Sequence, residues 1–417
     1  MKPLVLIPQY FGSLVFDRRT SRYAPFDPPA TAFFERAIDE PIAMLLEEDP
    51  EAAEFAQHFE REGFFRPDGR FAGVRLDATP PADHLLGPLA THIEVVAACN
   101  LTCTHCFAGT LPRKSTLRLD EIDRLFGELA RLGSYRVGLT GGEPLLRKDI
   151  LDVLDSATGH GLHPCLTTNG LLLDERLARE LGKRELVWLN VSLEGATAAT
   201  NDPIRGVGTF DAVVAKLRAL GKLFRFTLAF TITKPSAGEA EACATLAREL
   251  GAHTAVFRPL YPVGVARQHP ELVPSYDDYA GAIASLAGDL SSVDPFGPTA
   301  RRDTQATTYT GQGCGAANLV ASVSASGDVN PCSFLGTAFD AGNIRTRPFA
   351  EIWHDSLVFR RLRGTHGDFR GGCRARALAA HGDVEARDPW HDAWLGEGVG
   401  PSTNLSVRRR LPILEVR

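Results

Sequence analysis

Three cysteines within one short loop constrain this 417-residue chain more than any other feature of its sequence. Cys99, Cys103 and Cys106 follow an apolar stretch, residues 92–98, that is typical of a strand. Thiolates are soft ligands that suit zinc and iron–sulfur clusters. Three of them can each bind one corner of a four-iron cluster and leave the fourth iron open to a small molecule. A structural zinc site is the alternative, but it takes four ligands, and His105 lies inside the loop and would strain it.

With Phe107 directly after its last cysteine, the loop resembles the signature of the radical S-adenosylmethionine (radical SAM) superfamily. The resemblance implies that the three cysteines bind a [4Fe-4S] cluster and that S-adenosylmethionine (SAM) chelates the open iron. It also implies reductive cleavage of SAM to a 5′-deoxyadenosyl radical, which abstracts hydrogen from a substrate. An electron donor such as a flavodoxin or ferredoxin is an implied partner.

Strand and helix patterns alternate between residues 90 and 295. Strand-like runs lie at residues 92–98, 135–140, 162–168, 186–193, 224–233 and 254–257. Amphipathic helical stripes separate them, and residues 186–193 are almost continuously apolar, as in a strand buried on both faces. Six such units predict an α/β fold with a partial (β/α)6 TIM-type barrel, whose active site lies at the carboxyl ends of the strands.

Polar motifs fall at or after these strand ends. They are Gly141, Gly142, Glu143 and Pro144, then Thr168 and Asn169, then Ser192 and Glu194, and finally Arg205. Paired glycines let backbone approach a ligand, a carboxylate accepts from an ammonium group, and arginine binds a carboxylate in bidentate fashion.

The resemblance to the radical SAM core covers about residues 90–260 and implies a SAM site built from these motifs. Gly142 and Glu143 would meet the SAM amino group. Ser192 and Arg205 would meet its carboxylate or ribose, and the Phe107 backbone its adenine. No motif nominates a catalytic acid or base.

The C-terminal region, residues 300–395, carries three more candidate ligands, Cys314, Cys332 and Cys373. Their spacing around a hairpin resembles the SPASM extension of radical SAM enzymes, a small α+β iron–sulfur domain. A further cysteine run is missing from residues 364–370, so the second auxiliary cluster of such extensions is predicted to be absent. One auxiliary cluster with three cysteine ligands is predicted, and a degenerate extension without a cluster is the alternative.

The fourth site of that cluster is open or is taken by a histidine. His391 stands where the family has a closing cysteine, and His366 is a second candidate.

Residues 1–78 predict a winged-helix-like domain made of strands, helices and a hairpin. The domain resembles the peptide-recognition modules, similar to the chaperone of the pyrroloquinoline quinone pathway, in which a leader peptide pairs with a strand edge. The alternative is a helper domain that only packs on the barrel. Residues 79–89, with two prolines, read as a linker, and residues 396–417 as a tail.

Composition narrows the class of protein. The net charge of −6 does not suggest a nucleic-acid binder, and no apolar run reaches the roughly 18 residues of a membrane span. Eight cysteines without a secretion signal favour metal binding over disulfides. We expect a cytoplasmic protein.

These features predict a radical SAM enzyme that modifies a ribosomally synthesised precursor peptide by crosslinking, epimerisation or decarboxylation. The first alternative is a haem- or tetrapyrrole-pathway enzyme, because residues 371–376 and the Asp388-Pro pair are similar to those enzymes. The second is a non-catalytic, peptide-binding paralogue.

Overall fold

The computed structural model describes residues 2–109, 115–286, 314–363 and 372–396. His366, the boundary expected between residues 295 and 300, and the tail from residue 397 lie outside this part of the chain. No helix among the described residues is long and apolar enough to cross a membrane.

A nine-stranded sheet in the order β10-β9-β8-β7-β6-β5-β11-β12-β13 dominates the structure. Its first six members pair in parallel with their nearest neighbours: β5 (Ala90–Val96), β6 (Arg136–Gly141), β7 (His163–Thr168), β8 (Trp188–Leu193), β9 (Thr227–Ile232) and β10 (Thr254–Pro259). This arrangement confirms the predicted partial barrel. Because the strands are parallel, the loops that follow them meet at one edge of the sheet.

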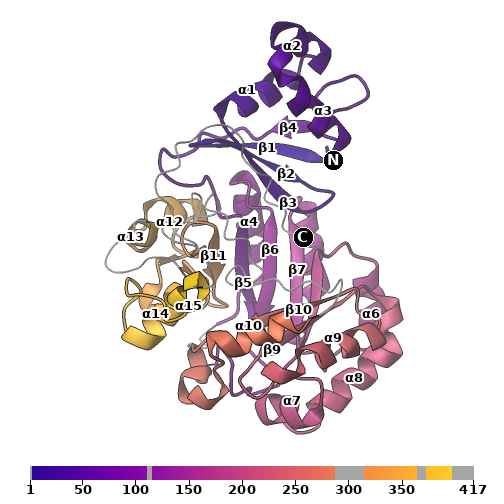
Figure 1. The fold of residues 1–417 in the computed structure, drawn as a ribbon, viewed down its shortest axis with the longest axis vertical. Coiled ribbons are helices and arrows are strands. Elements are labelled where there is room, and N and C mark those ends of the chain that lie inside the picture. The colour runs from indigo at the N-terminus through magenta and orange to yellow at the C-terminus, as the bar shows by residue number, and fades with distance from the viewer. Residues whose placement is uncertain (1, 110–114, 287–313, 364–371, 397–417) are drawn as a thin grey trace.

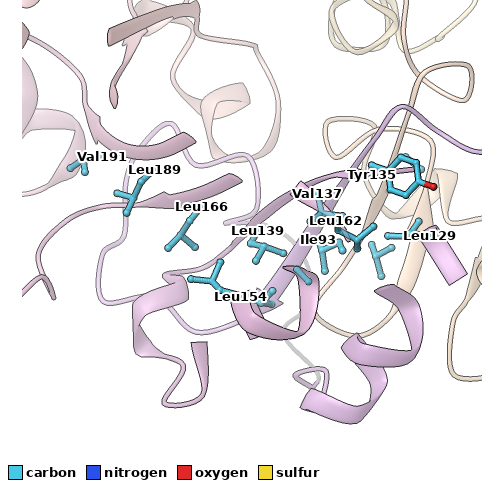
Figure 2. Packing of buried hydrophobic residues seen from close by; sticks show 14 of the residues in the cluster. Ile93, Leu129, Tyr135, Val137, Leu139, Leu154, Leu162, Leu166, Leu189 and Val191 are labelled. Atoms are coloured by element: carbon cyan, nitrogen blue, oxygen red, sulfur yellow. The ribbon is translucent and has the colours of Figure 1, made fainter. Parts of the chain in front are cut away.

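Helices follow the strands and bury their apolar stripes on the sheet. They are α4 (Leu119–Arg131), α5 (Ile150–Gly159), α6 (Glu175–Gly182), α7 (Ala198–Arg205), α8 (Thr209–Leu220), α9 (Ala240–Glu249) and α10 (Tyr276–Ala284). Figure 2 shows Leu129 of α4 and Leu154 of α5 beside the strand residues Val137 and Leu139. All four side chains are buried, so this layer holds the strand ends in fixed positions.

The C-terminal region continues the barrel sheet. Strand β11 (Val320–Val323) pairs in parallel with β5, and β12 (Asp328–Asn330) and β13 (Gly342–Asn343) extend it. The remaining helices are α12 (Phe349–Asp355), α13 (Leu357–Arg363), α14 (Arg374–His381) and α15 (His391–Gly396). They gather beside β5 and β11 in Figure 1. The strand that precedes the cysteine loop is therefore shared by the barrel and the extension.

The N-terminal domain is a four-stranded sheet covered by three helices (Figure 1). Its elements are β1 (Leu4–Gln9), β2 (Gly12–Asp17), β3 (Arg22–Phe26), α1 (Pro28–Ala37), α2 (Ile42–Glu48), α3 (Ala53–Arg61) and β4 (Gly73–Arg75), with the sheet order β3-β2-β1-β4. Strand β1 is buried on both faces. Leu4 and Leu6 pack into a cluster of phenylalanines under the helices, whereas Val5 and Ile7 join the core of the barrel.

The β2–β3 hairpin docks on the amino ends of β6 and β7. The Tyr23 hydroxyl donates to the Gly133 carbonyl at 2.9 Å and accepts from the Tyr135 amide at 2.7 Å. Ser21 Oγ lies 2.6 Å from His163 Nδ1. The N-terminal domain is thus attached at the end of these strands that lies opposite the cysteine loop.

The segment expected to be a linker, residues 79–89, is anchored in the core. Leu85 and Leu86 are buried, and the Leu85 carbonyl accepts a 2.9 Å hydrogen bond from Nε1 of the fully buried Trp353. The Arg363 guanidinium lies over the Trp353 ring, 4.5 Å from its centroid. Trp353 therefore joins the extension to the segment between the first two domains.

We expect Trp353→Ala to lower the free energy of unfolding by about 3–5 kcal/mol, because it leaves a large cavity and an unpaired carbonyl. Leu357→Ala is the control, since Leu357 is 79 % exposed and its loss should change stability by no more than about 0.5 kcal/mol. Urea unfolding followed by circular dichroism measures both. Equal midpoints for the two variants would contradict the anchoring role of Trp353.

Candidate active site

The cysteine loop leaves the carboxyl end of β5 and borders a cavity of about 810 Å³. Cys99, Cys103 and Cys106 are half-buried and line it together with Gly142. The opposite wall comes from the β11–β12 hairpin and the segments after it, including Ser322, Ser324, Asp328, Asn330 and Asp340. The three thiols are thus presented to one cavity shared by the barrel and the extension.

Gly141 and Gly142 let the backbone after β6 lie directly against the start of the cysteine loop. The Gly142 amide donates to the Val96 carbonyl at 2.8 Å, and the Glu143 amide donates to the Ala98 carbonyl at 2.8 Å. A Cβ atom on Gly142 would overlap the Ala98 carbonyl. Gly141 has φ +142°, which favours glycine. The glycine pair is therefore needed for loop packing as well as for any ligand.

Glu143 ties the ends of β6 and β7 together. One carboxylate oxygen accepts from Thr168 Oγ1 at 2.7 Å and from the Leu145 amide at 2.9 Å, and the other accepts from the Asn169 amide at 2.8 Å. Burial raises the pKa of Glu143, against these hydrogen bonds. Pro144 opens the short turn that follows, Pro144–Leu146.

Asn169 connects this network to the cysteine loop, because its Nδ2 donates to Asn100 Oδ1 at 2.7 Å. The predicted residues Glu143, Thr168 and Asn169 thus form one hydrogen-bonded set behind the loop.

Glu194, just past the end of β8, holds the loop from its other side. Its Oε1 atom lies 2.9 Å from His105 Nε2 and accepts from Arg205 Nε at 2.9 Å. Burial by itself would raise the pKa of Glu194, but the charges of His105 and Arg205 lower it to about 2. The carboxylate is therefore ionised and bound to both partners.

Burial raises the pKa of the Cys103 thiol to about 11, against the nearby positive charge of Arg205. A bound metal would supply the missing stabilisation of its thiolate. Within the described residues, no three histidine, cysteine or acidic side chains lie close enough to hold a single metal ion. The cysteine sulfurs that bind a four-iron cluster can lie farther apart, because each cysteine binds a different iron.

The remaining residues predicted to bind SAM lie farther from the cavity beside the cysteine loop. Ser192 lies near the end of β8 and is half-buried. The Phe107 ring packs edge-on against Phe334, with centroids 5.4 Å apart. Of the residues predicted to bind SAM, Gly142 lines the cavity, while Phe107, Ser192 and Arg205 are not among its lining residues in the described part of the chain.

The three C-terminal cysteines are candidate ligands of a second site. Cys314 and Cys373 are buried and Cys332 is half-buried. Burial, together with a smaller contribution from the charge of a Cys314 thiolate, raises the pKa of Cys332 to about 12, against a hydrogen bond with the Phe334 backbone. Burial also raises the pKa of Cys373, which interacts electrostatically with both other cysteines and with Arg376. Three mutually close thiols beside a buried cation fit an anionic iron–sulfur cluster.

Asp388 holds the backbone of Cys373 in place. Its Oδ2 atom accepts from the Cys373 amide at 2.6 Å and from Arg376 Nη2 at 2.9 Å, and Asp388 and Arg376 are 0 % and 4 % exposed. Gly372 has φ +89°, and a Cβ atom there would overlap the same carboxylate. His391 is buried and its amide donates to the Asp388 carbonyl at 3.0 Å.

The matches to known protein families cover both cysteine-bearing regions. Residues 93–246 match the radical SAM superfamily, and residues 314–375 match the SPASM iron–sulfur cluster-binding domain. The AdoMet-dependent heme synthase of Methanosarcina barkeri is 31 % identical over 71 % of this chain and 94 % of its own length. The chain belongs to the radical SAM superfamily.

Other relatives share most of their length with this radical SAM chain. The mycofactocin maturase MftC of Mycobacterium tuberculosis is 30 % identical over 72 % of this chain and 82 % of its own. The crystal structure of Streptococcus suis SuiB bound to its precursor peptide SuiA matches with a TM-score of 0.73 at 15 % identity, over 93 % of this chain and 98 % of that one. At that identity the match shows a shared fold.

The protein is therefore a radical SAM enzyme with a [4Fe-4S] cluster, SAM and an auxiliary iron–sulfur cluster as cofactors. The residues described above fit these groups: Cys99, Cys103 and Cys106 would hold the first cluster, and Cys314, Cys332 and Cys373 the second. When bound, the first cluster and SAM supply a carbon-centred radical. The surrounding side chains position the loop.

Sequence reasoning missed three residues that contact the candidate ligand loops or pair beside them. His105 was considered only as a strained zinc ligand, yet it contacts Glu194. Arg376 is stacked 4.2 Å from the centroid of the Trp390 ring, and Asp388 is its ion-pair partner. The sequence resemblance to the SPASM extension includes the Asp388-Pro pair, but no local signal shows that the Asp388 carboxylate reaches Cys373.

We expect Asp388→Asn to lower the iron content of anaerobically reconstituted protein from about eight to about four atoms per chain, because the support of Cys373 is weakened. This variant should still cleave SAM. The reference variant Cys103→Ala should also hold about four irons but should form no 5′-deoxyadenosine. Iron analysis and chromatography measure the two quantities, and an unchanged iron content in Asp388→Asn would contradict the assignment of the second site.

Proposed function

We propose that this radical SAM enzyme modifies a ribosomally synthesised precursor peptide, which the N-terminal domain holds by its leader. Support comes from relatives whose names include a mycofactocin maturase and the PqqA peptide cyclase of Xanthomonas campestris pv. campestris, 29 % identical over 72 % of this chain and 86 % of its own length. The observation that carries the proposal is the N-terminal domain itself, a separate sheet and helix layer that a radical SAM barrel does not need for its chemistry.

The N-terminal sheet has strands with unpaired edges. In the described residues β3 and β4 are the outer strands, and an extended peptide can pair with such an edge. The rings of Phe33, Phe55 and Phe65 are only partly buried at the rim of the phenylalanine cluster, and the Phe55 ring lies 6.4 Å from that of Phe26 in β3. Phe33 and Phe55 lie with centroids 5.6 Å apart. Edge hydrogen bonds and apolar contacts to these rings together suit a leader peptide.

The leader and the modified residue are held at different ends of the barrel. The N-terminal sheet docks at the amino ends of β6 and β7, whereas the cysteine loop lies at the carboxyl end of the parallel sheet. A six-residue strand spans about 20 Å. A precursor therefore needs at least about six extended residues between its leader segment and the residue that is modified.

The charge of the cavity walls disfavours the alternative substrate, a tetrapyrrole. Among the described lining residues, Glu94, Asp328 and Asp340 are acidic. Arg345 is the basic residue of this set, and its Nε already donates to Glu121 at 2.7 Å. A porphyrin with several carboxylates would meet like charges there, while a neutral or cationic peptide segment would not. The heme synthase relative keeps the alternative worth testing.

Direct assay separates the two substrate classes. Reduced, reconstituted enzyme is incubated with SAM and either a candidate precursor peptide or coproporphyrin, with a flavodoxin or ferredoxin as the proposed electron donor. We expect a mass change in the peptide together with 5′-deoxyadenosine. Conversion of coproporphyrin with no change in the peptide would reject the proposal.

The role of the phenyl rim can be tested without removing the domain. Deleting residues 1–78 would uncover the barrel residues packed on Val5 and Ile7, so a point substitution is cleaner. We expect Phe55→Ser to weaken binding of a fluorescent precursor peptide about tenfold, because an apolar anchor is lost. Met44→Ser is the matched control, since Met44 lies on α2 and is 54 % exposed. Equal affinities in both variants would reject leader binding at the rim.

A further inference from the structure

We propose that His105, Glu194 and Arg205 form a clamp that couples the position of the cysteine loop to the binding of SAM. His105 and Glu194 act in it as positioning residues. The inference rests on the proposal that Arg205 meets the carboxylate or ribose of SAM, and it adds a coupling between that contact and the cluster loop.

His105 gives the loop an attachment between two of its ligands. It directly precedes Cys106 and follows Cys103 by two residues, so a shift of its backbone also shifts both cysteines. Nε2 lies 2.9 Å from Oε1 of Glu194, whose side chain is 1 % exposed. A buried carboxylate is costly without a partner, so this contact holds the loop on the end of β8.

Arg205 binds the same carboxylate oxygen. Its Nε donates to Glu194 Oε1 at 2.9 Å, and its side chain is 9 % exposed. Because His105 and Arg205 share one oxygen, a displacement of either changes the position available to the other. A second link runs parallel to this one, since the Thr104 amide donates to the Ile204 carbonyl at 3.1 Å.

Glu194 itself has little freedom to absorb such a displacement. Its backbone amide donates to Asn201 Oδ1 at 3.1 Å, and Asn201 is fully buried in α7, the helix that ends at Arg205. The strand end, the helix end and the cysteine loop therefore meet at one carboxylate.

Three buried polar atoms at this place point to a ligand. Glu194 Oε2, His105 Nδ1 and Thr104 Oγ1 have no hydrogen-bond partner among the described residues. Buried polar atoms are rarely left without a partner, and these three surround the same contact. A polar molecule bound beside the loop would satisfy them, which separates this cluster from an ordinary internal ion pair.

A double-mutant cycle on SAM affinity tests the coupling. The dissociation constant of SAM is measured by equilibrium dialysis on full-length, anaerobically reconstituted wild type, His105→Ala, Arg205→Lys and the double variant. We expect each single variant to bind SAM more weakly and the double variant to fall short of the product of the two effects by at least threefold. Effects that multiply, or a His105→Ala affinity within twofold of wild type, would overturn the clamp.

Spectroscopy supplies a readout that a merely structural contact would not move. In wild type we expect the electron paramagnetic resonance signal of the reduced cluster to change when SAM is added, and in His105→Ala we expect a smaller change. His163→Ala is the matched control, because His163 also makes a polar side-chain contact, with Ser21, but at the opposite end of the barrel. A control that shifts the signal as much as His105→Ala would overturn the proposal.

Two further results complete the test. If His105→Ala loses the cluster, His105→Gln replaces it in the cycle, because a glutamine amide can still donate to Glu194. Recovery of iron and of SAM affinity in His105→Gln supports the clamp, and loss of both rejects it. Failure of wild type to bind SAM would instead reject the SAM site on which the inference rests, so the two failures are distinguishable.

Discussion

The structure depends on how a short loop with three thiols is held against the carboxyl edge of a parallel sheet. Thiolates that bind a cluster need fixed positions, yet a loop has few backbone hydrogen bonds of its own. Here the neighbouring strand ends supply them: the Gly142 amide donates to Val96, and the Glu143 amide to Ala98. The buried carboxylates of Glu143 and Glu194 then accept hydrogen bonds on the two sides of this edge. The loop is rigid because the barrel around it is rigid.

The same edge connects the two cysteine sites. Strand β11 pairs with β5, so the strand that delivers Cys99 also carries the extension. Phe107, next to Cys106, packs against Phe334, two residues after Cys332, and Phe334 in turn packs against Tyr261. Both cysteine regions are therefore attached to the same sheet. The cavity beside the cysteine loop has walls from the barrel and from the extension.

The N-terminal domain is attached far more intimately than a flexible peptide-binding module would be. One face of its sheet belongs to the barrel core and the other to its own phenylalanine cluster. The contacts of Tyr23 and Ser21 place it at the amino ends of the barrel strands. Its position leaves a leader-binding role open only for a precursor long enough to reach the other end of the barrel.

Sequence alone determined the fold class and the family, and it nominated the candidate ligand cysteines, because these depend on local spacing: apolar periodicity, glycine pairs and short cysteine loops. It also placed Glu143, Thr168, Asn169, Glu194 and Arg205 near one another, since parallel strands end at one edge. Only the tertiary structure decided what these side chains contact. Glu143 meets the amides after β7, Arg205 shares Glu194 with His105, and Asp388 supports Cys373 across fifteen positions of chain. The physical reason is that buried charges choose partners by the geometry of packed elements, which spacing along the chain does not encode.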